Sequence, residues 1–182
     1  FQEPMSALDP TMRVGRQVAE AMRVHGVPRR RARQRTLELL ADVGIPDPAA
    51  RSRAYPHEFS GGMAQRVMLA IALAGDPRLV IADEPTTALD VTVQGQILDL
   101  LGDLAARRGV GVLLITHDLG VVAEIADRVA VMYAGQIVET GPLDTVLARP
   151  QRPYTAGLIA AVPRNRPRAG ARLGGGAARA LR

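Results

Sequence analysis

LVIADEPTTALD, residues 79–90, runs an apolar stretch directly into two adjacent carboxylates and a proline. The apolar part is short and contains β-branched residues, so we expect a buried strand over residues 78–82 rather than a helix. Ligands of parallel sheets gather at the carboxyl ends of the strands. Asp83 and Glu84 would lie there, where one carboxylate could hold Mg²⁺ and the other could orient and deprotonate a water molecule. Two acids that simply cap a loop are the alternative.

A second apolar run, residues 110–116, follows after an amphipathic helix that stops at Gly109. Strand, helix, strand implies a right-handed crossover onto a parallel sheet, so the predicted fold class is α/β. His117 ends the second strand, and adjacent parallel strands would place it near Glu84, where it could hydrogen-bond a phosphate oxygen. A purely structural histidine is the alternative, and Asp90 could simply cap the helix that follows it.

Ser60, Gly61 and Gly62 stand where another helix begins, and that helix stops near Gly75. Unpaired N–H groups and the positive end of the helix dipole would point outward at this start. The two glycines would let an anion approach the backbone without a Cβ in the way. A capped helix start with a flexible turn is the alternative.

The rest of the chain contains few chemistry-bearing residues. Residues 11–43 are predicted to be helical, and we interpret the run RRRARQR at 29–35 as a solvated helix face rather than a binding patch. Two strand-like runs flank Ala134 and Gly135, which suits a hairpin. The Arg/Gly/Ala-rich residues 164–182 are predicted to be disordered.

Composition narrows the class of protein. Hydrophobic residues make up 47% and charged residues 23%, as in ordinary globular chains. The net charge of +5 arises in the tail, because residues 1–163 hold 17 arginines against 18 acids. This near-neutral body argues against nucleic-acid binding. The lack of cysteine excludes disulfides and thiolate catalysis.

The motifs together resemble the ATP-binding subunit of an ABC transporter, of the peptide and nickel importer branch. The resemblance covers residues 1 to about 163 and rests on FQEP (Q-loop), FSGGM (signature), LVIADEP (Walker B and catalytic Glu), ALD (D-loop) and ITHD (switch His). It implies a partial P-loop NTPase-like cassette with a parallel sheet core and a helical subdomain. The implied division is 1–60 for the Q-loop and helical subdomain, 61–141 for the signature helix and ATPase core, 142–163 for an importer-type extension, and 164–182 for the tail.

The same resemblance implies roles for individual residues. Gln2 would reach toward Mg²⁺ and the attacking water, and Asp83 would hold Mg²⁺ through water. Glu84 would polarise that water, and His117 would contact the γ-phosphate of ATP. The cofactor-binding group would also include Asp90 and the signature residues Ser60, Gly61 and Gly62, the latter three closing onto ATP held by an opposite cassette.

The implied partners are a second ATPase subunit, identical or not, transmembrane permease subunits and, indirectly, a solute-binding protein. The implied place is the cytoplasmic face of the cell membrane. No G-x-x-x-x-G-K-[ST] phosphate loop occurs, since all 23 basic residues are arginine. We therefore expect the chain to be a C-terminal fragment that is inactive and poorly soluble alone. A soluble ABC ATPase of DNA repair or translation, and a truncated non-catalytic dimerisation partner, are the alternatives.

Overall fold

The computed structural model describes residues 7–86 and 89–161, so the predicted site residue Gln2 and the predicted disordered tail lie outside the described residues. The chain forms two compact units, Phe1–Ala126 and Asp127–Arg182. The first contains α2 (Val14–Arg23), α3 (Arg29–Asp42), α4 (Pro48–Arg51), the 3₁₀ helix η1 (Pro56–Glu58), α5 (Gly61–Leu73), β1 (Leu79–Asp83), α6 (Val91–Arg108), β2 (Gly111–Ile115) and α7 (Leu119–Ile125). The second contains β3 (Arg128–Tyr133), β4 (Gln136–Pro142), α8 (Leu143–Ala148) and α9 (Pro153–Ala161).

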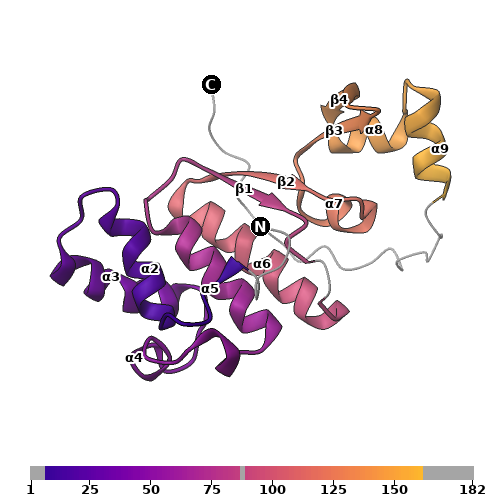
Figure 1. The fold of residues 1–182 in the computed structure, drawn as a ribbon. Helices are drawn as coiled ribbons and strands as arrows, with labels where there is room; N and C mark the ends of the chain where they lie inside the picture. Colours follow the sequence, from indigo (N-terminus) through magenta and orange to yellow (C-terminus); the bar gives the residue numbers. More distant parts are fainter. Residues whose placement is uncertain (1–6, 87–88, 162–182) are drawn as a thin grey trace. The chain divides into compact units, whose positions relative to one another are not determined.

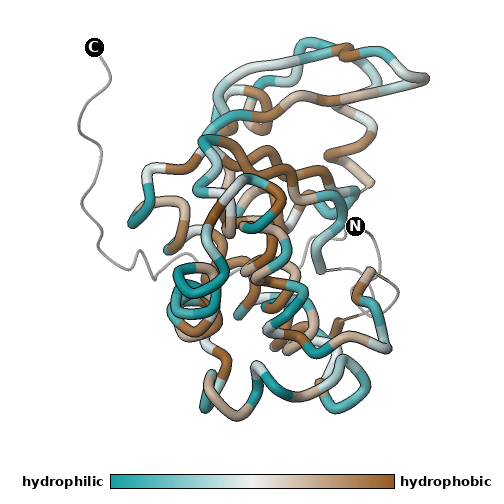
Figure 2. Tube along the Cα trace, turned by 60° about the vertical axis from the view of Figure 1, so that its left-hand side comes forward, coloured by the Kyte–Doolittle hydropathy of each residue, from teal (hydrophilic) through white to brown (hydrophobic). Residues whose placement is uncertain are grey.

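Helices α2, α3 and α5 pack together at one end of the first unit (Figure 1). Each presents an apolar stripe at helical spacing, such as Val14, Val18 and Met22 on α2, which are all buried. Figure 2 shows hydrophobic and hydrophilic residues mixed along the trace. The predicted helical stretch 11–43 is two helices, because Gly26 adopts a positive φ of 83° and Pro28 follows it.

Two helix starts follow their predicted caps. The Ser60 hydroxyl accepts from the Met63 N–H at 3.3 Å at the start of α5. The Asp90 carboxylate accepts from the Val93 N–H at 2.9 Å at the start of α6, which ends at Gly109. These caps fix where the two helices begin, on either side of β1.

Strands β1 and β2 are parallel, with Leu79 opposite Gly111 and Asp83 opposite Ile115. The predicted strand pair is therefore confirmed within a residue at each end. Among the described residues, each of these strands pairs only with the other. Burial alternates along β1, since Val80 packs into the core while Ile81 is exposed.

The second unit is built on a β3–β4 hairpin. The turn residues Ala134 and Gly135 both have positive φ, which confirms the predicted hairpin. Helix α9 was not predicted: the carboxylate of Glu139 accepts the Gln151 and Arg152 N–H groups immediately before it. The four-part division of the chain stays a prediction, and the boundary between the two compact units falls after residue 126.

No helix in the described ranges 7–86 and 89–161 is both long and apolar enough to cross a membrane.

Candidate functional site

The site is built where β1 and β2 end side by side. Asp83 closes β1, and the Glu84 N–H donates to the Ile115 carbonyl at 2.8 Å, which extends the strand pairing by one residue. His117 lies two residues after Ile115, the last residue of β2. The parallel register thus delivers two carboxylates and an imidazole to one edge of the sheet.

Glu84 has an unusual backbone conformation, with a φ of +45°. The left-handed region costs a non-glycine residue on the order of 1–2 kcal/mol, so the surrounding structure must compensate for this strain. The turn at Glu84 redirects the chain directly after the strand.

The Glu84 carboxylate contacts the His117 ring, with 2.8 Å between Oε1 and Nδ1. The His117 side chain is 80% exposed and that of Glu84 is 30% exposed, so the pair lies at the surface. The hydrogen bond to Glu84, supported by its negative charge, raises the pKa of His117 above its ordinary value of 6.5. Glu84 contacts the Nδ1 atom, and most of the His117 side chain is open to solvent.

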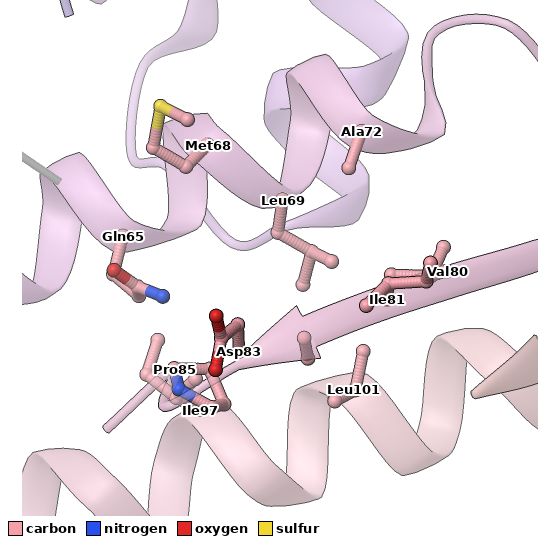
Figure 3. A pocket seen from close by; sticks show the side chains of 11 residues that line it. Gln65, Met68, Leu69, Ala72, Val80, Ile81, Asp83, Pro85, Ile97 and Leu101 are labelled. Carbon is pink, nitrogen blue, oxygen red and sulfur yellow. The ribbon is translucent and has the colours of Figure 1, made fainter. Parts of the chain in front are cut away.

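Asp83 lies in a small pocket of about 80 Å³ between α5, β1 and α6. Figure 3 shows Asp83 and Gln65 toward one end of this pocket, and Ala72 and Val80 toward the other. Glu84 does not line the pocket. The two acids therefore serve different surroundings: a mostly apolar pocket for Asp83, and an exposed imidazole for Glu84.

The turn of Ser60, Gly61 and Gly62 is accessible at the start of α5. A Cβ on Gly62 would lie 2.7 Å from Cγ1 of Val93, and one on Gly61 would lie 3.7 Å from Leu89. Gly62 is thus required for close packing against the start of α6, a reason that the sequence prediction of an anion approach did not include. Asp90 is exposed and caps α6, which is the structural role foreseen as its alternative.

Gln94 is a residue that the sequence analysis missed. Its side-chain amide donates to the Thr86 carbonyl at 3.1 Å and to the Leu89 carbonyl at 3.2 Å. Gln94 therefore ties together Thr86 and Leu89, which lie in the segment after the two acids. The available signal was a glutamine four residues after the helix cap Asp90, one turn into α6.

The donor set limits what this edge could bind. Within the described residues, no group of three or more His, Cys, Asp or Glu side chains is placed to hold a metal ion. Mg²⁺ is commonly bound by one or two carboxylates together with phosphate oxygens and water, so Asp83 fits that pattern rather than an all-protein cage.

Comparisons with known proteins connect this geometry to a family. The family model described as "ABC transporter" matches residues 1–87, and "Oligopeptide/dipeptide transporter, C-terminal region" matches residues 138–181. The chain is related to the ATP-binding subunits of ABC transporters. The recognition made from the motifs is thereby confirmed.

Individual relatives agree with this relationship. The chain is 57% identical over 164 residues to the oligopeptide transport ATP-binding protein OppD of Bacillus subtilis (strain 168), covering 90% of this chain and 46% of that protein. It is 57% identical over 168 residues to the peptidoglycan transport ATP-binding protein YejF of Agrobacterium fabrum (strain C58 / ATCC 33970), covering 92% and 31%. The chain spans about half the length or less of these curated relatives.

A solved structure also resembles this chain. It is the ATP-binding cassette MJ0796, in a dimeric post-hydrolysis state bound to ADP and Pi, with a TM-score of 0.66 and 29% identity. The likeness covers 79% of this chain and 61% of that chain. It confirms the predicted fold class, a partial cassette with a parallel sheet and a helical part.

Proposed function

We propose that this chain forms part of an ATP-hydrolysing subunit that energises an ABC importer of peptides or related solutes such as nickel. One observation carries the proposal: the Glu84–His117 pair lies at the carboxyl ends of two parallel strands, within motifs of the ABC family. The names of the relatives, which include oligopeptide transport, support the solute class.

In the proposed mechanism, Glu84 polarises the attacking water. A carboxylate in this role needs a defined orientation, and the contact with His117 supplies one. With Nδ1 facing Glu84, the Nε2–H of the raised-pKa imidazolium can donate to a phosphate oxygen. His117 would therefore link the carboxylate that activates water to the phosphate that is attacked.

Asp83 would hold Mg²⁺ through water, with Gln2 approaching from the Q-loop. The ion would neutralise charge on the phosphate oxygens, which is where phosphoryl transfer gains most from its enzyme. The chain's own contribution is the placement of Asp83 at the end of β1, in a pocket that Gln65 also lines and whose other walls are mainly apolar.

The accessible Ser60–Gly62 turn would act on ATP bound by a second cassette. Its support is the exposed start of the 13-residue helix α5, where N–H groups favour an anion. MJ0796 is dimeric in the comparable structure. The partners would be a second ATPase subunit, permease subunits and, through them, a solute-binding protein, at the cytoplasmic face of the membrane.

The experiment has to supply a phosphate loop, because these residues contain none. We would replace the matched 164-residue segment of the Bacillus subtilis relative with this chain's residues, so that the relative supplies the remainder. The chimera should hydrolyse ATP, and the isolated 182-residue chain should show negligible hydrolysis. A folded chimera that binds ATP without hydrolysing it would contradict the ATPase role and favour the non-catalytic dimerisation partner. Brisk hydrolysis by the isolated chain would overturn the expected dependence on the missing loop.

A further inference from the structure

We propose that the first half of α3 binds the anionic headgroups of a lipid bilayer through four arginines, here called the α3 arginine cluster. All four are exposed: Arg29, Arg30, Arg31 and Arg33. This contact adds a membrane-binding surface to the proposed function. It rests on the charge arrangement and not on hydrolysis, so it can be tested without ATP.

The cluster lacks counter-ions within the described part of the chain. Between Glu20 and Glu38 the sequence contains no acidic residue. Two neighbouring arginines show what a paired position looks like: Arg23 contacts Glu20 at 3.2 Å and Arg35 contacts Glu38 at 3.2 Å. No ion pair joins any member of the cluster to the described acids, so their charges face solvent together.

The charges also run against the dipole of their helix. Helix α3 begins directly with arginines and has no acid in its first turn, whereas Glu38 and Asp42 lie toward its C-terminal end. Cations near a helix N-terminus and anions near its C-terminus are both unfavourable. Folding of α3 gains nothing from this order, because the buried contacts come from Ala32, Thr36, Leu39 and Leu40. An external anionic surface would be attracted to the arginines at the start of α3 and would offset this unfavourable order of charges.

An exposed apolar residue lies five positions before the first arginine of the cluster. Val24, in the turn between α2 and α3, is 70% exposed. Segments that lie at a membrane interface combine basic residues, which attract anionic lipids, with apolar side chains. Val24 and the cluster belong to the α2–α3 end of the first unit (Figure 1).

A nucleic acid would offer the same phosphate charge but fits less well. Aromatic side chains that stack on bases are a common part of single-strand binding surfaces. The sequence has no aromatic residue between Phe1 and Tyr55, so α2 and α3 have none. The sequence alone favoured a solvated face for residues 29–35; the absence of counter-ions and the exposed Val24 now favour the lipid surface.

The test measures sedimentation of the full chain with vesicles of phosphatidylcholine alone, or of equal parts phosphatidylcholine and phosphatidylglycerol. The cluster variant replaces Arg29, Arg30, Arg31 and Arg33 with Gln. The control variant makes the same four-charge change at exposed arginines on four other segments: Arg53, Arg78, Arg107 and Arg128. The C-terminal arginines are common to all three proteins, so their contribution cancels in the comparison.

We expect binding to the phosphatidylglycerol vesicles only, and weaker binding as sodium chloride rises. The cluster variant should bind at least about tenfold more weakly, since each basic residue near an anionic surface contributes about fivefold. It should also unfold at the same or a higher denaturant concentration, because the unfavourable first-turn charges are gone. Equal losses in the cluster and control variants, unchanged binding in the cluster variant, or tighter binding to duplex DNA than to vesicles would overturn the proposal.

Discussion

Two regions of the first unit differ in how completely they are covered. In the helical region the apolar stripes are enclosed, and Leu39 and Leu40 are fully buried. In the strand pair one face packs on the helices through residues such as Val80, whereas four large apolar side chains of the two strands remain between 46% and 61% exposed: Leu79, Ile81, Leu113 and Ile115. The acids and the histidine of the candidate site stand at the end of this less covered region.

The difference indicates which part of the molecule depends on additional structure. The helices bury their apolar surface against one another, so their stability arises within the described residues. A large exposed apolar surface marks an interaction site or an aggregation hazard, and within residues 7–86 and 89–161 neither β1 nor β2 pairs with a third strand. The curated relatives are about twice as long as this chain, or longer.

The largest effect should come from the site itself. In the chimera with the Bacillus subtilis relative, Glu84→Gln should lower kcat by about 10²–10⁴-fold, because it removes the base that activates water. Glu124→Gln on α7, which is exposed, makes the same change away from the strand ends and should leave kcat unchanged. Similar ATP hydrolysis rates in the two variants would separate Glu84 from catalysis.

Next in size is a pair of core truncations that compares the two regions directly. Leu39→Ala should lower the free energy of unfolding by about 2–5 kcal/mol, because it opens a cavity in the enclosed helical core. Ile81→Ala should cost about 0.5 kcal/mol or less, because that side chain is already mostly exposed. Urea unfolding of dilute protein gives both values. A loss of unfolding free energy for Ile81→Ala as large as that for Leu39→Ala would mean that the sheet face is covered.

A smaller effect concerns association. We expect the isolated chain to self-associate through the uncovered sheet face, with scattered light rising with protein concentration. Replacing Ile81 and Leu113 with Thr keeps β-propensity while reducing apolar surface, so association should shift to higher concentration. The matched change at Met132 and Ile137 of the second unit, which are also exposed, should shift it less. A monomeric parent chain at all concentrations would contradict this prediction.

Much of the fold could be predicted from local chemistry. The caps at Ser60 and Asp90 and the hairpin turn at Ala134 depend on residues within a few positions, and each prediction is confirmed. Helix α9 was missed because the carboxylate that accepts the N–H groups just before its first turn belongs to Glu139, which lies in β4 and is distant in sequence. The break at Gly26 was missed because the apolar residues on both sides share a helical period.

The site was predicted in outline and not in detail. Parallel pairing placed Glu84 beside His117, as two short apolar runs indicated. The positive φ of Glu84, the reach of Gln94 and the packing need of Gly62 all depend on tertiary neighbours that the sequence pattern does not name. Both faces of β1 carry apolar residues, and the sequence does not show which face is covered.

The contact between Glu84 and His117 also makes a prediction for pH. Because Glu84 raises the pKa of His117, the stability that this contact provides is fully present below pH 6.5 and is lost as the pH rises through the higher folded-state pKa. The His117 side chain is 80% exposed, so solvent and salt screen its charge and we expect only a modest change in stability across this window. Denaturant unfolding of the parent and of Glu84→Gln at acidic and alkaline pH would measure the difference.

The most direct test of the shared strand end is an NMR titration of the three histidines in the dilute 182-residue chain. We expect the pKa of His117 to lie above 6.5 and to fall toward that value in Glu84→Gln. An identical His117 titration in the parent and in Glu84→Gln would show that the two strand ends do not meet, and the proposed hydrolytic site would lose its basis.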